Sequence, residues 1–304
     1  TETPKGNVLR SKDKPITIKG PVYPNALFRV AVFPKTQADS TKINSALTKL
    51  CEEDMTLSWY NDPLTFQTIL QGMGDQHIDV VIRRAETKLQ VGIDTDIPRV
   101  PFKEAINGKG DARYRHKKQS GGSGQFGEVA LRVSPFKDGD LDFKNDIFGG
   151  AISGSYLPAI EKGIRNVMKE GILAGYPVSG ITVSVYDGKE HPVDSKPIAF
   201  EIAGRGAFKE AYMQANPILL EPIMNVKVIV PEEYMGDIMG DLSSRRGKPQ
   251  GMDPQGNYQL IRAQVPLSEM LTYASTLKSI TSDQGPYHME FAQYETDPAP
   301  VQEQ

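Results

Sequence analysis

The chain has 304 residues, of which 38% are hydrophobic, 24% charged and 8% aromatic, a composition typical of a folded globular protein and not of a disordered one. Its 28 Gly and 22 Pro residues indicate many short elements separated by turns, which excludes a fibrous protein and a single helical bundle. The 35 basic and 38 acidic residues give a net charge of −3. No overall positive field therefore attracts nucleic acid, and RNA binding would depend on local patches.

Two absences from the sequence favour the cytoplasm and exclude membrane insertion. The single cysteine, Cys51, cannot form an intramolecular disulfide. The longest apolar run is Val30 to Phe33, far shorter than the roughly twenty residues of a membrane-spanning helix. We expect a cytoplasmic protein without membrane contact.

The first part of the chain predicts two helices and four strands. Residues 1–20 have no helix signal and resemble the end of a domain that begins upstream. A strand then alternates from Phe28, and a helix capped by Asp39 follows it. Short strands are expected near 57–60 and 68–71. The two helices are expected to bury Ile43, Ala46, Leu47, Leu50 and Cys51, and Ile78, Val81, Ile82, Ala85 and Leu89. This β-α-β-β-α-β order predicts a ferredoxin-like split β-α-β sandwich over residues 21–97.

The same order returns over residues 219–304. A strand with Val226, Val228 and Val230 precedes a helix that contains Ile238 and ends near Gly247. Strands around residue 250 and over 258–265 follow, then a helix after Ser268 and a last strand near 287–294. The first apolar position of the second helix lies 35 residues after that of the first in both units (78 − 43 and 270 − 235). We therefore predict a second ferredoxin-like sandwich, followed by a short tail.

Residues 98–218 form a third α+β unit of different character. Strands are expected around Val129–Val133 and Ile181–Val185, and a helix that begins near Pro158 ends at Gly171. A second helix carries Phe208, Ala211, Tyr212 and Ala215. The whole chain is thus predicted to be an α+β protein of three domains.

The densest glycine cluster, Gly121–Gly127, matches phosphate-binding loops only in part. A dinucleotide fingerprint requires a helix after the glycines, but Glu128–Val133 alternates as a strand. A P-loop requires Lys and then Ser or Thr, where this chain has Glu128 and Val129. The kinase glycine loop fits locally, but no kinase catalytic motif follows it. We expect no nucleotide site here.

No other enzyme motif is complete. Asp138, Asp140 and Asp142 have calcium-loop spacing, but Phe143 and Gly149 stand where that loop needs Gly and Glu. The four histidines are far apart in the sequence and lack metal-site or hydrolase motifs. The sequence predicts neither catalytic residues nor a metal site.

Three patches remain as candidate RNA contacts. The stretch Lys103–Lys118 has six basic and two acidic residues and leads into the glycine cluster, where backbone amides can approach phosphates. A predicted turn, Tyr186–Pro192, presents His191, and Arg245 and Arg246 flank a helix end. From these residues alone, a solvated hairpin explains the first patch equally well, while an exposed turn and a helix cap are the preferred interpretations of the second and the third.

These segments also carry a resemblance to the C-terminal three domains of bacterial elongation factor G. The segments that carry it are Phe33–Thr36 and Gly72–His77 in domain III, Gln119–Gly127, Leu173–Pro177 and Tyr186–Gly188 in domain IV, and Leu220–Met224, Pro231–Asp237 and Arg245–Gly247 in domain V. The resemblance covers nearly the whole chain, and residues 1–20 resemble the last strands of the preceding domain II. It implies two ferredoxin-like domains, III and V, on either side of a domain IV that resembles domain 2 of ribosomal protein S5.

The resemblance implies a monomeric, ribosome-binding part of a translational GTPase that promotes tRNA–mRNA translocation. Domain IV would reach the decoding site, with two tip loops against the codon–anticodon duplex, and domain V would meet ribosomal RNA and protein. The tip residues would be Ser120, Gly121, Gly122, Ser123, Gly124, Gln125, Lys189, Glu190, His191 and Pro192, and further RNA contacts would come from Arg115, Lys117, Lys118, Arg245 and Arg246. No cofactor is expected in this chain, because GTP and Mg²⁺ would bind a preceding domain.

Several positions depart from the common pattern of the family. Ser123 stands where a basic residue is usual, and Gly74–Ile78 replaces the usual Gly-Glu-Leu-His-Leu. Pro298 and Pro300 interrupt the expected C-terminal helix. These departures suggest a divergent second paralogue. The alternative function is a recycling or ribosome-protection factor that occupies the A site without driving translocation.

Overall fold

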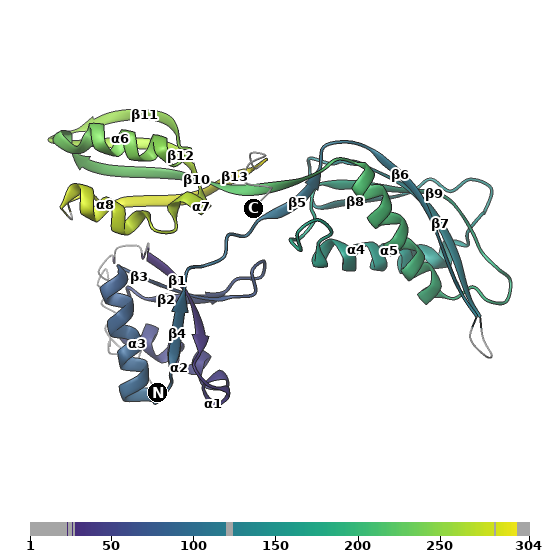
Figure 1. Cartoon of the computed structure of the whole chain (residues 1–304), viewed down its shortest axis with the longest axis horizontal. Helices are drawn as coiled ribbons and strands as arrows, with labels where there is room; N and C mark the ends of the chain where they lie inside the picture. Colours follow the sequence, from purple (N-terminus) through teal and green to yellow (C-terminus); the bar gives the residue numbers. More distant parts are fainter. Residues whose placement is uncertain (1–22, 24–25, 27, 120–123, 283, 297–304) are drawn as a thin grey trace, which may run out of the picture. The chain divides into compact units, whose positions relative to one another are not determined.

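The computed structural model describes residues 23, 26, 28–119, 124–282 and 284–296, so the segment 1–20 lies outside it. Its strands form three sheets (Figure 1). Among the described residues, those up to Val100 and those of Pro222–Gln293 form one compact unit, and those of Pro101–Glu221 form the other, together with the end of the last strand. Each sheet and its helices are described separately below.

The first sheet is antiparallel, with the strand order β2-β3-β1-β4. Its elements are β1 (Phe28–Pro34), α1 (Gln37–Ser40), α2 (Ile43–Glu53), β2 (Ser58–Asn61), β3 (Thr68–Gly72), α3 (Asp75–Leu89) and β4 (Ile93–Asp96). The apolar faces of α2 and α3 share one core with the sheet, in which Leu47, Leu70 and Val81 are fully enclosed. The predicted ferredoxin-like order is confirmed.

The predicted cap of the first helix was wrong by three residues. Thr36 is the N-cap of α1, and Asp39 is its third residue. The Asp39 N–H donates to Thr36 Oγ1 (3.3 Å) and the Thr36 N–H donates to Asp39 Oδ2 (3.1 Å), which is a reciprocal capping box. A short helix therefore precedes α2, which begins at Ile43 without a side-chain cap.

Cys51 lies on α2 and packs against this core, as the apolar spacing predicts. Burial raises the pKa of its thiol to about 11, and the nearby Asp54 carboxylate adds to the shift. Because the thiolate is the reactive form, Cys51 is a weak nucleophile at neutral pH.

The second sheet repeats the first, with the strand order β11-β12-β10-β13. Its elements are β10 (Pro217–Pro231), the short 3-10 helix Glu232–Tyr234, α6 (Met235–Ser244), β11 (Lys248–Gln255), β12 (Tyr258–Pro266), α7 (Leu267–Met270), α8 (Tyr273–Thr281) and β13 (Tyr287–Thr296). The predicted repeat is confirmed, because the four strands occupy the same order as in the first sheet. The start of β10 also pairs with β5 (Lys103–Ile106), so one strand runs through the predicted domain boundary at residue 218.

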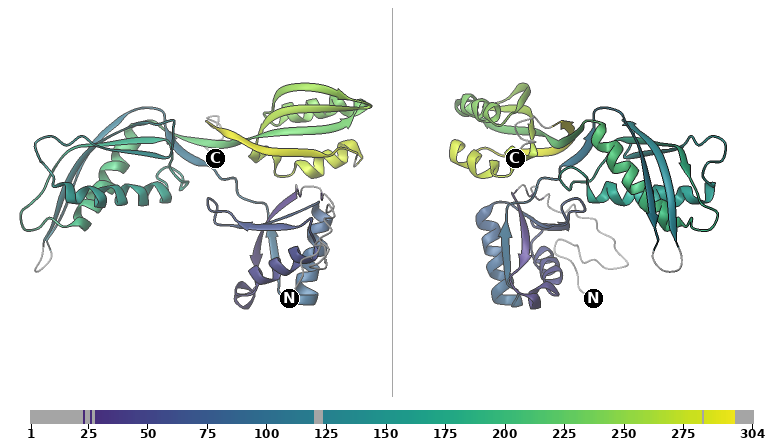
Figure 2. Two further views of the ribbon diagram at one scale, coloured as in Figure 1. Left: turned by 180° about the vertical axis from the view of Figure 1, so that it is seen from behind. Right: turned by 45° about the vertical axis from the view of Figure 1, so that its right-hand side comes forward.

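The third sheet, β6-β7-β9-β8, belongs to the second unit. Its elements are β6 (Gly110–Lys118), β7 (Gln125–Pro135), β8 (Leu141–Asn145), the 3-10 helix Gly154–Tyr156, α4 (Leu157–Glu170), β9 (Ile181–Lys189) and α5 (Pro197–Gln214). Helices α4 and α5 cover one face, and the other face carries no helix (Figures 1 and 2). The sequence predicted β7, β9 and both helices but missed β5, β6 and β8.

A glycine allows the close approach of α5 to this sheet. A Cβ atom on Gly206 would lie 2.5 Å from Cγ of the Tyr114 ring on β6, so any side chain there would separate the helix from the strand. The core between the helices and the sheet includes Val129, Leu131, Phe200 and Phe208, all fully enclosed. This packing fixes the strand ends that carry the candidate site.

Candidate RNA interface

Two connections leave the same end of the third sheet, which we call the tip. Lys118 at the end of β6 pairs with Gln125 at the start of β7, and Lys189 at the end of β9 pairs with Glu128. The predicted residues Ser120, Gly121, Gly122 and Ser123 lie outside the described residues. The second connection, residues 190–196, leads into α5 and is described in full; we call it the tip loop.

The predicted turn at Tyr186–Pro192 was wrong in its first half. Residues 186–189 continue β9, and the tip loop begins only at Glu190. Gly188 therefore has a packing role, because a Cβ there would overlap the side chain of Ile152. A Tyr-Asp-Gly sequence is typical of a turn, but here the glycine serves the close approach of a neighbouring side chain.

Hydrogen bonds tie the tip loop to the start of β7. The Phe126 N–H donates to the Asp194 carbonyl oxygen (3.0 Å). Ser195 Oγ donates to the Phe126 carbonyl oxygen (3.0 Å) and accepts from the His191 N–H (2.8 Å). Tyr156, stacked on Phe200, donates to the Ser195 carbonyl oxygen (3.3 Å). The tip loop thus has a fixed backbone despite its exposure.

His191 is half-exposed, and its ring completes the loop. Nδ1 accepts hydrogen bonds from the Val193 N–H (3.3 Å) and the Asp194 N–H (3.2 Å). A neutral ring that accepts at Nδ1 carries its proton on Nε2, and Nε2 has no partner among the described residues. The ring can therefore donate one hydrogen bond to a molecule at the tip.

The other predicted residues at the tip differ in availability. Lys189 is exposed, and no ion pair involves it in the described part of the chain. Glu190 accepts from the Ser153 N–H (2.9 Å), so one of its oxygens already has a protein partner. At the other connection, Gln125 Oε1 lies 3.2 Å from His116 Nε2. Val193, which the sequence analysis passed over, is 78% exposed at the centre of the loop.

The basic stretch Lys103–Lys118 forms the two strands β5 and β6, and the residues of β6 alternate between the two faces of the third sheet. Arg113, Arg115 and Lys117 lie on the open face, while His116 and Lys118 have the opposite parity. On the open face, Glu128 is buried between the guanidinium groups of Arg113 (2.8 Å) and Arg115. Burial opposes the charge of Glu128, but the two arginine hydrogen bonds outweigh it and hold its pKa below the ordinary value.

Arg245 and Arg246 have protein partners in the second sheet's domain. Arg245 donates to Asp241 Oδ2 (2.8 Å), to the Glu269 carbonyl oxygen (2.6 Å) and to Thr276 Oγ1 (3.0 Å). Arg246 donates to Glu269 Oε1 (3.1 Å) and to Ser268 Oγ (3.0 Å). These contacts support the helix-end interpretation for Arg245. The RNA-binding role of the pair stays a prediction.

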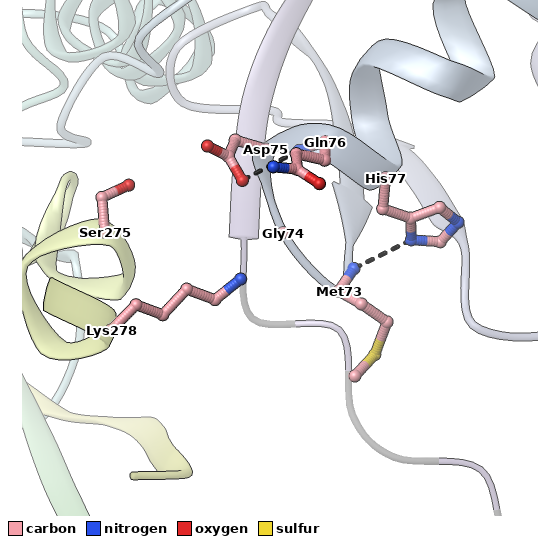
Figure 3. A pocket seen from close by; sticks show the side chains of 7 residues that line it. All are labelled: Met73, Gly74, Asp75, Gln76, His77, Ser275 and Lys278. Atoms are coloured by element: carbon pink, nitrogen blue, oxygen red, sulfur yellow. Dashed lines mark hydrogen bonds between the residues drawn. The ribbon is translucent and has the colours of Figure 1, made fainter. Parts of the chain in front are cut away.

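The segment Met73–His77 lines an open pocket in the first unit together with Ser275 and Lys278 (Figure 3). His77 Nδ1 accepts from the Met73 N–H (3.1 Å), and Nε2 lies 3.1 Å from Asp54 Oδ2. Both ring nitrogens of His77 are therefore used in holding the start of α3. Among the described residues, no Ser, Thr or Cys side chain bonds to this histidine.

Sequence reasoning gave no structural role to Glu104 and Glu128, two of the buried carboxylates of the second unit. Glu104 on β5 accepts four backbone N–H groups of the segment Ile172–Tyr176 at 2.7–3.1 Å. The only sequence signal was an acidic residue inside each strand, at Glu104-Ala-Ile and Glu128-Val-Ala-Leu.

Within the described ranges, no helix is long and apolar enough to cross a membrane, and no group of three or more His, Cys, Asp or Glu side chains could hold a metal ion.

Comparisons with known proteins match all three parts of the chain. Family models match at residues 23–97 (elongation factor G, domain III), 98–216 (elongation factor G, domain IV) and 218–304 (elongation factor G C-terminus). An elongation factor G-like protein of Thermotoga maritima is 43% identical over 300 residues, 98% of this chain and 44% of that protein. A crystal structure of a protein from Thermus thermophilus matches with a TM-score of 0.83 and 37% identity, over 98% of this chain and 44% of that one.

The chain thus spans less than half the length of these relatives. The predicted combination of two ferredoxin-like domains and a distinct α+β domain agrees with the three matched models and with the structural neighbour. Together they identify the chain as domains III, IV and V of a member of the elongation factor G family.

Proposed function

We propose that this chain is the ribosome-binding part of an elongation factor G-like translational GTPase that promotes tRNA–mRNA translocation. GTP and Mg²⁺ would bind a preceding domain, and the described residues would act without chemistry of their own. Membership of the family supports a role in translation. The partners would be ribosomal RNA, ribosomal proteins and the tRNA–mRNA duplex in the decoding site.

The single observation that carries the proposal is the bonded tip of the third sheet. The tip loop is held by backbone and Ser195 contacts to Phe126, and the His191 ring retains one unused donor. A duplex whose sequence changes at every step has to be held through backbone and sugar groups, which hydrogen-bond donors of this kind can contact without reading bases. A rigid loop loses little conformational entropy when it makes such contacts.

We expect the double variant His191→Ala/Ser195→Ala, in the full-length protein, to slow single-round translocation by about tenfold or more, since displaced contact groups can lose that much of a rate. Translocation would be followed by the fluorescence of a labelled mRNA 3′ end. GTP hydrolysis on the ribosome should change by less than about twofold, because the tip lies outside the nucleotide domain. Met213→Ala, an exposed position near the other end of α5, is the matched control.

An unchanged translocation rate in the double variant would contradict the proposal. The alternative function, recycling or ribosome protection without translocation, predicts a different result when the unaltered full-length protein is added to the same ribosome complexes. The parent protein would then fail to move the mRNA but would accelerate subunit splitting or displace a bound A-site ligand.

A further inference from the structure

Charged side chains are unevenly distributed along the open face of the third sheet. Four rows of side chains cross this face from the base of β6 towards the tip. They are Asp111, Arg132, Ser184 and Lys144 in the first row, Arg113, Ala130 and Asp187 in the second, Arg115, Glu128 and Lys189 in the third, and Lys117 and Phe126 in the fourth. The base rows and the tip rows use their cations differently.

In the base half of the face, which consists of the first and second rows, the cations form ion pairs with carboxylates. Arg132 pairs with Asp111 (2.9 Å) and lies over the Tyr186 ring, with its guanidinium carbon 4.2 Å from the ring centre. Tyr186 also donates to Asp111 (2.6 Å), a hydrogen bond that holds the pKa of the Asp111 carboxyl below its usual range. Lys144 pairs with Asp142 (3.0 Å), and Arg113 pairs with Asp187. Each of these three cations therefore lies beside a carboxylate that compensates its charge.

The tip half has cations without such partners. Lys117 and Lys189 are exposed and form no ion pair within the described ranges. Arg115 donates to Glu128 through its Nε, and its two terminal NH2 groups have no partner in the part of the chain that the structure describes. The buried carboxylate fixes the plane of the guanidinium. Three cations therefore stand against one buried acid, and the surplus charge lies next to the tip.

The chemistry of this surface fits a polyphosphate backbone. Lys and Arg are the side chains that contact phosphate oxygens, and such contacts position a nucleic acid without reading its sequence. Arg115 presents a planar fork with free donors, which suits phosphate better than a single point charge. The net charge of the chain is negative, so the electrostatic attraction of RNA has to come from local surpluses of this kind.

We infer that Arg115, Lys117 and Lys189, here called the basic strip, form a second RNA-backbone site on the open face of the third sheet, separate from the tip loop. The area that RNA contacts would end at the first two rows, where the cations are already in ion pairs. The inference deepens the proposed function and rests on it for the identity of the RNA. A duplex would thus be held by the tip loop and along the last two rows of the sheet. The paired cations Arg132 and Lys144 would lie outside the contact.

The salt dependence of RNA binding tests the basic strip. Binding of the 304-residue chain to a short RNA hairpin is measured between about 30 and about 300 mM KCl, since each phosphate contact contributes about one unit to the slope of log K against log [salt]. The variant Lys117→Gln/Lys189→Gln should reduce the magnitude of that slope by roughly 2. The control Arg132→Gln/Lys144→Gln removes the same charge from the same face and should leave the slope within about 0.5 of the parent.

Equal changes of slope in the two double variants would overturn the inference, because only total charge would then matter. The inference would also fail if the parent chain did not bind the hairpin at low salt. Binding to ribosomes forms a second arm. If the strip variant weakens ribosome binding but leaves hairpin binding unchanged, the partner of the strip is an acidic protein surface and the RNA site is wrong. Failure of the parent to bind ribosomes, with the hairpin result as expected, would count against the proposed function alone.

Discussion

Replacing Glu104 by glutamine is expected to destabilise the domain of the third sheet by about 3 kcal/mol or more. The Glu104 side chain is fully buried and accepts the N–H groups of Ile172 (2.7 Å), Leu173 (2.9 Å), Ala174 (2.8 Å) and Tyr176 (3.1 Å). A glutamine has one acceptor oxygen. Its NH2 group would therefore face two N–H donors, which lose their acceptor and gain a repulsive neighbour.

Hydrogen exchange measures this effect within one domain of the chain. The amides of α4 and α5 should exchange faster in Glu104→Gln by a factor of about 100 or more, since each 1.4 kcal/mol is tenfold in an equilibrium constant. The single tryptophan, Trp59 on β2, reports on the first sheet and should show an unchanged urea midpoint. The control Glu170→Gln breaks an exposed pair with Arg205 (2.9 Å) and should cost less than about 1 kcal/mol. Parent-like exchange in Glu104→Gln would show that the carboxylate is dispensable.

Truncation of Arg245 to alanine is expected to destabilise the domain of the second sheet by about 3 kcal/mol. The Arg245 side chain is only 15% exposed, and the paired Asp241 carboxylate is similarly enclosed. The guanidinium also lies 5.2 Å from the centre of the Tyr273 ring. Alanine would leave Asp241 without its cation and would remove the hydrogen bonds that join α6, α7 and α8.

The variant Arg245→Lys should recover only part of the loss, because one ammonium cannot reach the three acceptors that the planar guanidinium reaches. Hydrogen exchange of α6 and α8 again provides the measurement. The control Arg262→Ala removes an exposed arginine paired with Asp253 and should cost less than about 1 kcal/mol. If Arg245→Ala exchanges like the parent but loses affinity for ribosomes, the arginine contacts RNA directly and its structural role is minor.

The order of elements could be predicted wherever the apolar periodicity was strong. Val226, Val228 and Val230 alternate cleanly, and the helix faces repeat at the same 35-residue offset in both ferredoxin-like domains, so the repeat was visible without coordinates. The strand β6 was missed because its inward positions are Ala112, Tyr114 and His116, a set with little hydrophobic contrast. The strand β8 is short, and acidic residues around it favoured a turn.

The geometry of the candidate site could not be predicted from the sequence. The position of Lys117 and Lys189 on the same face depends on the register of β6, β7 and β9. A sequence pattern does not specify this register when one of the strands is missed. The hydrogen bonds of Arg113 and Arg115 to Glu128 could not be predicted for the same reason. The hydrogen bond from Ser195 to Phe126 joins residues 69 positions apart, and no local sequence pattern predicts such a bond.

The measurement closest to the central claim is directed hydroxyl-radical probing from the tip. Val193→Cys places a thiol at an exposed position of the tip loop, while Cys51, with its raised pKa, should label slowly. An iron chelate attached there, in the full-length protein on the ribosome, is expected to cleave RNA of the decoding region in the small subunit. Cleavage from Met213→Cys, near the other end of α5, should map elsewhere. Cleavage from position 193 that misses the decoding region, or that matches the pattern from position 213, would contradict the account.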